Sequence, residues 1–380
     1  MGLNRGRVWA LLALVVLIVA LVFWMSRRDR GSEQPVQAAT QPSASVDAGS
    51  RADTSIARPA APMSPNTAPT PVSVVAPQSG DGGATQGRVF ATAPWGSQLG
   101  QLGHDRPQEA NPEGPMSLAT DAQGNVFVLD QLNHRIVRYG RDGRAAQSVP
   151  LTQGAAQDVA VGRDGTLAVL DRHADQNVAV VGPDGTPRGS LPIVGRGVAE
   201  SGGVTGLVVD GNDVYVEREH GPLVRIGDLA GTVDTARPEI PGRPTRDGHS
   251  YLTAGLIDPA AGRFYVNSIA RDTGDHRWTR ELQIQFTLMS ILLLDTDRAG
   301  TIYTAVLAMP PGTEETHGAH DLVVLMCLDP TDGHPIGQTA LPPNTLPEET
   351  FRDFAVLDEG GVVYQVRDEH GVSLRRYDCR

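Results

Sequence analysis

The chain of 380 residues contains no lysine, so all 32 of its basic residues are arginines. This absence excludes a lysine Schiff base and a lysine-bearing phosphate loop, and it fits a high-GC bacterial codon bias. The two cysteines are too few for a disulfide scaffold or for a zinc site built from thiolates alone. Aromatic residues make up only 5%, whereas 43 glycines and 28 prolines give a turn-rich composition that argues against an all-helical fold.

Basic residues are also fewer than acidic ones, 32 against 44. The whole chain has a formal net charge of −12, and residues 87–380 alone carry 25 arginines and 39 acidic residues, a net charge of −14. Proteins that bind DNA or RNA through the phosphates need the opposite sign, because neutralising phosphates releases counterions. We therefore expect no nucleic acid among the partners of this chain.

The longest apolar run covers residues 8–25 and contains no charged residue. At 1.5 Å per residue, a helix of this length spans about 27 Å, which is close to the hydrocarbon thickness of a bilayer. Tryptophans at positions 9 and 24, with arginines on both sides, are typical of membrane–water interfaces. We interpret residues 1–30 as a transmembrane signal anchor. The alternative is a cleaved secretory signal, whose apolar part is usually shorter and is followed by a small-x-small site.

Residues 31–86 are rich in proline, alanine, serine and threonine and show no apolar periodicity, so we predict a disordered tether. It is either a spacer across an envelope gap or a tolerated linker. Two arginines precede the apolar run and three follow it, which weakly favours a cytoplasmic C-terminal side. Because a long tether after a lone helix suits an exported domain, we instead expect a single-pass protein of the cell inner membrane, with its C-terminal domain facing the periplasm.

From residue 87 onward, short β-patterned runs alternate with turn signals. The clearest unit, residues 114–143, contains an apolar strand, a tight turn, a second apolar strand ending in Asp130, an alternating third strand and an Asp-Gly turn. This order returns five more times, and the tight turns fall near positions 124, 165, 212, 262, 300 and 360. Spacings of roughly 40 to 60 residues match blades of four strands. We predict an all-β fold, a six-bladed β-propeller over residues 87–380, with five or seven blades as the alternatives.

The two ends of this region predict how the ring closes. The last unit ends at Cys379 after its third strand, and residues 87–93 form an isolated strand before the first unit. We predict that the N-terminal strand completes the last blade, which removes both free sheet edges. Cys327 and Cys379 occupy similar positions in neighbouring blades. Because third strands of adjacent blades usually diverge beyond the roughly 7 Å that a disulfide allows, we expect a buried thiol at Cys327, with a bridge as the alternative.

The first unit also carries a family resemblance. Residues 95–136, which include the motif Asn133-His134-Arg135, resemble the NHL-repeat family of β-propellers, whose name comes from an Asn-His-Leu-type motif. The match is specific over this stretch, and the other five units share only its order of strands and turns. The resemblance implies a propeller that binds proteins, RNA or small ligands. Related six-bladed propellers include calcium-dependent lactonases.

One turn connects this chain with those lactonases. The sequence Pro112-Glu113-Gly114-Pro115 resembles the Glu-Gly-Pro turn that places a glutamate on their metal, so Glu113 is the candidate metal ligand and Ca²⁺ the candidate cofactor. The other oxygen ligands have no convincing counterparts, so the alternative is an exposed carboxylate before a turn. We interpret His317 and His320 as part of a solvated loop rather than as a metal site. Strand-end aspartates are expected to cap turns, not to act as acids or bases; they stand at positions 121, 130, 171, 210 and 295.

No nucleophile elbow, Walker loop, dinucleotide fingerprint or HExxH motif occurs in the sequence. Together with the anchor and the tether, this favours a binding module over an enzyme. We expect a monomeric, membrane-tethered propeller without a cofactor that presents its loops to an envelope protein or a polysaccharide. The alternative is a calcium-dependent hydrolase of the lactonase or esterase type with an axial metal at Glu113.

Overall fold

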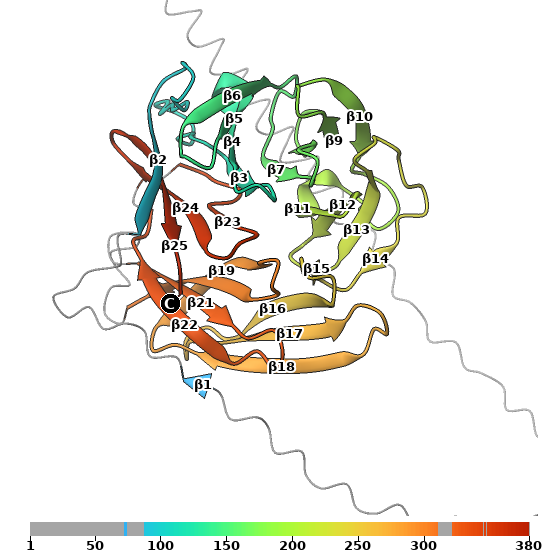
Figure 1. The fold of residues 1–380 in the computed structure, drawn as a ribbon, viewed down its shortest axis with the longest axis vertical. Helices are drawn as coiled ribbons and strands as arrows, with labels where there is room; N and C mark the ends of the chain where they lie inside the picture. Colours follow the sequence, from blue (N-terminus) through green and yellow to red (C-terminus); the bar gives the residue numbers. More distant parts are fainter. Residues whose placement is uncertain (1–71, 74–86, 311–320, 345, 347, 380) are drawn as a thin grey trace, which may run out of the picture. The chain divides into compact units, whose positions relative to one another are not determined.

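The computed structural model describes residues 72–73, 87–310, 321–344, 346 and 348–379. By compactness the chain divides into Met1–Pro65 and Asn66–Arg380, and all described residues belong to the second unit. Their strands form six sheets around a central axis, which confirms the predicted all-β, six-bladed propeller (Figure 1). The predicted membrane segment and nearly all of the predicted tether lie outside the described residues. Among the described ones, no helix is long and apolar enough to span a membrane.

The first three blades are four-stranded antiparallel sheets whose strands follow one another outward from the axis. The first blade contains β3 to β6, bounded by Ser117–Thr120, Val126–Asp130, Arg135–Tyr139 and Ala145–Pro150, with the short helix η1 at Gln131–Asn133. The second blade contains β7 to β10, bounded by Asp158–Val161, Leu167–Asp171, Asn177–Val181 and Pro187–Pro192. The third contains β11 to β14, bounded by Val204–Asp210, Asp213–Arg218, Leu223–Asp228 and Glu239–Ile240, after η2 at Ser201–Gly203.

Among the last three blades, the fourth and the sixth depart from this plan at an outer edge, and the fifth follows it. The fourth contains β15 to β18, bounded by Arg243–Pro244, Ser250–Asp258, Arg263–Ala270 and His276–Gln283, and its outermost strand pairs in parallel with β1 (Val72–Ser73). The fifth contains β19 to β22, bounded by Thr287–Thr296, Ile302–Met309, Leu322–Leu328 and Pro335–Leu341. The sixth contains β23 to β25, bounded by Phe354–Val356, Val362–Asp368 and Gly371–Tyr377, and is completed by β2 (Arg88–Pro94).

The strand β2 closes the ring, as predicted. It pairs antiparallel with β25, and the outermost position of the sixth blade is thereby filled by the strand that comes before the first blade. In Figure 1, β2 lies beside β25 at the point where the first and last colours of the propeller meet. The closure gives the sixth blade its fourth strand, so β25 is paired on both sides.

The fourth blade differs from its predicted strand order. The sequence pattern predicts that Gly262 lies in the tight turn after the innermost strand, which is wrong, because β15 is innermost and pairs with β16 at Tyr251 and Leu252. Gly262 therefore lies one turn later, between β16 and β17. The two residues of β15 are too few for an alternating pattern, so the sequence carries no periodic signal for this strand.

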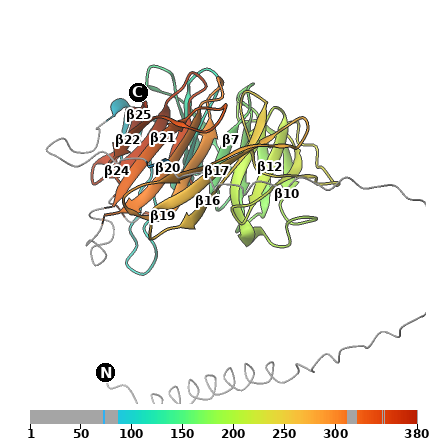
Figure 2. The same cartoon turned by 90° about the horizontal axis from the view of Figure 1, so that it is seen from below.

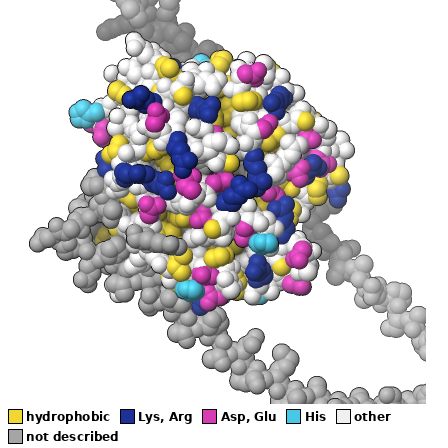
Figure 3. All heavy atoms as spheres, viewed as in Figure 1, with side chains coloured by type: hydrophobic (Ala, Val, Ile, Leu, Met, Phe, Trp, Pro, Cys, Tyr) yellow, Lys and Arg dark blue, Asp and Glu magenta, His cyan; other side chains and the backbone are white. Residues whose placement is uncertain are grey.

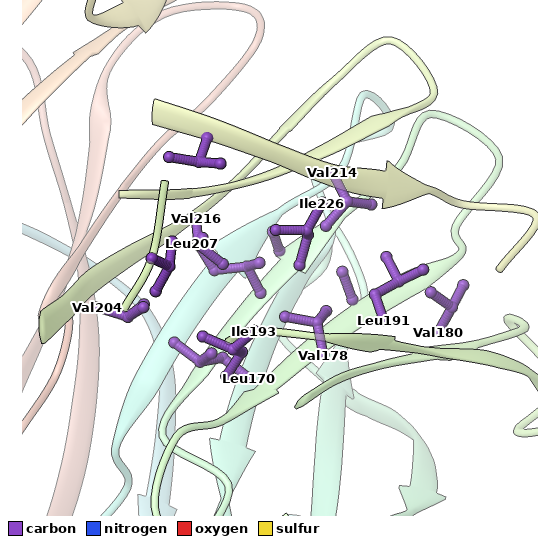
Figure 4. Packing of buried hydrophobic residues seen from close by; sticks show 14 of the residues in the cluster. Leu170, Val178, Val180, Leu191, Ile193, Val204, Leu207, Val214, Val216 and Ile226 are labelled. Carbon is purple, nitrogen blue, oxygen red and sulfur yellow. The ribbon is translucent and has the colours of Figure 1, made fainter. Parts of the chain in front are cut away.

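Apolar side chains fill the spaces between neighbouring blades. Figure 4 shows this for the second and third blades, where Val178 and Leu191 pack in one cluster with Val214 and Ile226. All four side chains are 0% exposed. Because each blade is covered on both faces, its central strands are continuous apolar runs; all five residues of β4 and of β8 are buried. Figure 2 shows the domain edge-on, with the blades side by side.

Cys327 and Cys379 form a disulfide, so the expectation of a buried free thiol at Cys327 is wrong. Their Cα atoms lie 5.9 Å apart, within the range for a bridge. Cys379 is not part of the third strand but follows it, and there the chain crosses to the fifth blade. It passes over Gly337, the cross-strand partner of Cys327, where an added Cβ would collide with the Cys379 carbonyl oxygen. The missing side chain at Gly337 thus permits the close approach.

Candidate functional site: the axial channel

The channel along the propeller axis contains two adjoining cavities. The wide cavity, of about 590 Å³, lies where the innermost strands begin, beside Asp158 and Thr205. The narrow cavity, of about 190 Å³, lies where the same strands end, beside Asp210 and Asp295. The two cavities share a layer of lining residues that consists of Arg243, Leu292, Leu293, Leu294, Arg352 and Phe354.

Asp158 and Arg352 form an ion pair that fastens four blades together at this layer. The Asp158 carboxylate is 0% exposed and accepts hydrogen bonds from Ser117 Oγ at 2.6 Å, from the Leu207 amide at 3.0 Å and from Arg352 Nη2 at 2.6 Å. Arg352 Nη2 also donates to the Leu207 carbonyl oxygen at 2.8 Å. A buried carboxylate with this many hydrogen-bond donors has its polar atoms satisfied by the protein itself, so its role is structural.

A second charged cluster lies at the narrow cavity. Arg246 donates to Asp295 Oδ2 at 2.9 Å and to Asp358 Oδ1 at 2.8 Å, and so joins the fourth, fifth and sixth blades. Burial opposes the ionisation of Asp295, but the attraction of Arg246 and Arg243 outweighs it and holds the pKa of this carboxyl below its usual range. Figure 3 shows arginine and acidic side chains interspersed on the face of the propeller that is seen in Figure 1.

The wide cavity has one polar wall, which comes mainly from the third blade. Glu217 Oε2 accepts a hydrogen bond from Thr205 Oγ1 at 3.1 Å, and His220 Nδ1 lies 4.0 Å from the same carboxylate oxygen. The His220 side chain is 83% exposed, so solvent screens this contact. Asp353, at the edge of the sixth blade, is engaged by Arg367 Nη1 at 2.8 Å.

A second wall of the wide cavity is apolar and comes from β16 and β19. Leu256, Met289 and Leu292 line the cavity and are each 38% to 39% exposed, and neighbouring Ile257 is 44% exposed. Met289, Leu292 and Ile257 are each skipped in the pairing registers of their strands, so each occupies a β-bulge. Bulges turn side chains away from the regular alternation, and here they bring apolar residues to the surface at the cavity.

The structure places Glu113 at the surface. Its main chain forms bridges with Asp105 and Glu349, its side chain is exposed, and it lines neither cavity. Glu113 as a calcium ligand thus stays a prediction. The carboxylates that line the two described cavities do not share a cavity with it. The loop with His317 and His320 lies outside the described residues. Within the described part of the chain, one group of His and Asp side chains has ligand atoms within 4.8 Å of one another: Asp329, Asp332 and His334, in the turn that follows β21.

The strand-end aspartates divide into two kinds. Asp121 Oδ1 accepts from the amides of Gln123 and Asn125 at 2.9 Å, and Asp171 caps the next turn in the same way, as predicted. In contrast, Asp210 and Asp295 line the narrow cavity and form ion pairs with arginines. Turn chemistry alone does not distinguish the two kinds, because the arginine partners come from other blades.

The motif Asn133-His134-Arg135 fastens a loop rather than forming a site. Asn133 Nδ2 donates to Asp130 Oδ2 at 2.8 Å and to the Gly96 carbonyl oxygen at 3.0 Å. Arg135 Nε donates to the same Asp130 oxygen at 2.8 Å, and its Nη atoms reach carbonyl oxygens of the same loop. These bonds hold the segment after β2 against the first blade and account for the motif structurally.

Three arginines of the channel are not predicted by the sequence pattern: Arg243, Arg246 and Arg352. A faint signal exists in Arg243-Pro244-Thr245-Arg246, since two arginines three positions apart in a buried β-segment need partners. The partners lie far away along the chain, with Asp158 and Arg352 separated by 194 residues. Pattern analysis of single units cannot pair them.

No family model matches the chain, and no curated protein matches it. Solved structures do match. Hydrazine synthase from Kuenenia stuttgartiensis is 16% identical over 69% of this chain and 78% of its own, with a TM-score of 0.44. A DUF4221-family protein from Bacteroides vulgatus is 10% identical over 77% and 96%, with a TM-score of 0.44. A catalytically inactive virginiamycin B lyase from Staphylococcus aureus is 10% identical over 72% and 88%, with a TM-score of 0.38. At these values the likeness says nothing about the activity of this chain, and membership of the NHL family is not shown.

Proposed function

We propose that the chain is a binding module rather than an enzyme, and that an envelope protein or a polysaccharide binds to the face of the propeller around the wide cavity. In this proposal the chain is an NHL-like propeller, anchored in the inner membrane by residues 1–30 and held in the periplasm by the tether. The carboxylates of the channel carry the argument against catalysis.

Each aspartate that lines either cavity forms an ion pair with an arginine: Asp158 with Arg352, Asp210 with Arg271, Asp295 and Asp358 with Arg246, and Asp353 with Arg367. A general acid or base works best with a pKa near the ambient pH, whereas an adjacent arginine favours the ionised carboxylate. These five aspartates therefore act as fixed charges beside an open cavity, which suits binding better than proton transfer. Glu217 also lines the wide cavity and bonds to the Thr205 hydroxyl instead of an arginine.

A site-specific crosslinking experiment tests the partner proposal. A photo-crosslinking amino acid replaces Leu256 at the wide cavity, and the matched control replaces Val233, which is similarly exposed at 45% but lines neither cavity. We expect a discrete adduct in intact cells from position 256 and none from 233. If the unchanged protein and Val233→Asp sediment with isolated cell-wall material and Leu256→Asp does not, the partner is a polysaccharide. Equal results at both positions would contradict the proposal.

The proposed location has its own test. An alkaline-phosphatase fusion after residue 86 should be active, because this enzyme needs an oxidising compartment for its disulfides. A fluorescent protein that folds only in the cytoplasm should stay dark at the same position. The reverse pattern would overturn the periplasmic location and the envelope partner with it.

A further inference from the structure

Arg243 stands out among the charged residues of the wide cavity. It lies in the innermost strand of the fourth blade and lines both cavities. The three carboxylates of the wide cavity have donors, since Arg352 engages Asp158, Thr205 engages Glu217 and Arg367 engages Asp353. Among the described residues, no side chain forms a hydrogen bond or ion pair with the Arg243 guanidinium; Asp295 attracts it, but the oxygens of Asp295 bond to Arg246 and Thr296.

A half-buried guanidinium without partners has lost part of its hydration and gained no hydrogen bonds in exchange. Arg352 adds donors to the same layer. Only its Nη2 has hydrogen-bond acceptors among the described residues, while Nε and Nη1 have none. Both arginines line the wide cavity with free N–H groups, and the planar fork of a guanidinium matches a carboxylate.

The apolar wall of the same cavity is partly exposed to solvent. Leu256, Met289 and Leu292 expose more than a third of their surface at the cavity, and the bulges in β19 are what place Met289 and Leu292 there. Bulges beside a binding site re-aim side chains toward a ligand. The cavity volume of about 590 Å³ is in the range of sites for drug-sized molecules.

We propose that the wide cavity binds a small amphipathic carboxylate, such as a medium-chain acyl acid. Its carboxylate bonds to Arg243 and to the free N–H groups of Arg352, and its chain lies on Leu256, Met289 and Leu292. The ligand is a monoanion, because Asp158, Glu217 and Asp353 line the same cavity and repel a phosphate dianion. This inference goes beyond the proposed macromolecular partner and does not depend on it.

Calorimetric titration of the full chain in lipid nanodiscs with octanoate tests the proposal. We expect saturable binding by octanoate, about 10-fold weaker binding by hexanoate, since each buried CH₂ contributes about 0.8 kcal/mol, and none by acetate. Octanol, which keeps the chain and lacks the charge, should bind at least 10-fold more weakly than octanoate. Equal binding of octanol and octanoate, or no saturable octanoate binding, would overturn the proposal.

Variants locate the site. Arg243→Gln should weaken octanoate binding by about 10- to 100-fold, the range for a lost hydrogen bond to a charged group. The matched control Arg163→Gln changes an exposed arginine that lines only the narrow cavity, and it should bind like the unchanged chain in nanodiscs with the same lipid background. Arg243→Lys keeps the charge without the fork and should bind with intermediate affinity. Arg243→Gln that binds like Arg163→Gln would place the ligand elsewhere and refute the assignment. Because all these titrations use purified protein, they succeed or fail independently of the crosslinking result.

Discussion

The disulfide between Cys327 and Cys379 should contribute a large part of the stability of the propeller. It joins residues 52 positions apart, from the third strand of the fifth blade to the end of the sixth. In the chain-entropy model, closing a loop of this length in the unfolded chain corresponds to about 4 kcal/mol at 25 °C. Typical unfolding free energies are about 5 to 15 kcal/mol, so reduction should lower the free energy of unfolding by a substantial fraction and the Tm by about 10 °C.

Three forms of the protein separate the cross-link from the packing of its sulfur atoms. Urea unfolding is compared for the oxidised chain, the reduced chain and the double variant Cys327→Ala/Cys379→Ala. Both residues are buried, so the double variant loses sulfur packing as well as the bond. We expect the reduced chain to lose about 4 kcal/mol and the double variant to lose slightly more. Equal stability of oxidised and reduced chains would refute the reasoning, because the bridge would then not restrict the unfolded chain.

Three more predictions concern the charged clusters and the motif of the first blade. Arg352→Met should lower the free energy of unfolding by about 3 to 5 kcal/mol, because it leaves the fully buried Asp158 without its counter-ion, and combining it with Asp158→Leu should restore part of the loss in urea unfolding. The pKa of Asp295 is lower in the folded chain than its unfolded value of about 3.9, so its stabilising effect is complete above that pH and is lost as the pH falls through the folded pKa. The stability difference between the unchanged chain and Asp295→Asn should therefore shrink between pH 5 and pH 2, and a constant difference would contradict the argument. Asn133→Ala should lower the free energy of unfolding by about 1 to 2 kcal/mol, and it should speed amide exchange in residues 96–103 while leaving β24 protected. Unchanged exchange in residues 96–103 would show that the Asn133 hydrogen bonds do not hold this segment.

The features that the sequence predicted are those encoded within single units. Turn glycines such as Gly124 and Gly165 have positive φ angles of 77° and 83°, so the turn residues visible in the sequence are the ones the backbone requires. The isolated strand before the first unit could be matched to the missing fourth strand of the last, because each blade needs a covered edge. Both inferences rely on local pattern and on counting strands.

The features that the sequence did not predict depend on contacts between units. The bridge between Cys327 and Cys379 exists because the chain crosses to the fifth blade over Gly337. The pattern of strands and turns within each unit does not predict this crossing. The channel is similar, since Arg352 and Asp158 become partners only when the ring has closed. Glu113 as a calcium ligand stays a prediction from a turn motif, which fixes the local backbone but not the direction of the side chain relative to the axis.

The strand β2 has a consequence for the time at which the domain can be completed during synthesis. Arg88 in β2 pairs with Arg376 in β25, so β2 is made before the first blade but can pair only after the last strand of the propeller has been made. At about 5 to 20 residues per second, that wait is roughly 15 to 60 s. Throughout this interval β2 has an open hydrogen-bonding edge, and a nascent chain shorter than about 375 residues has no native partner to offer it. The edge of β2 is therefore open to pairing with other chains until β25 has been made, and closure of the ring is the step that removes this hazard.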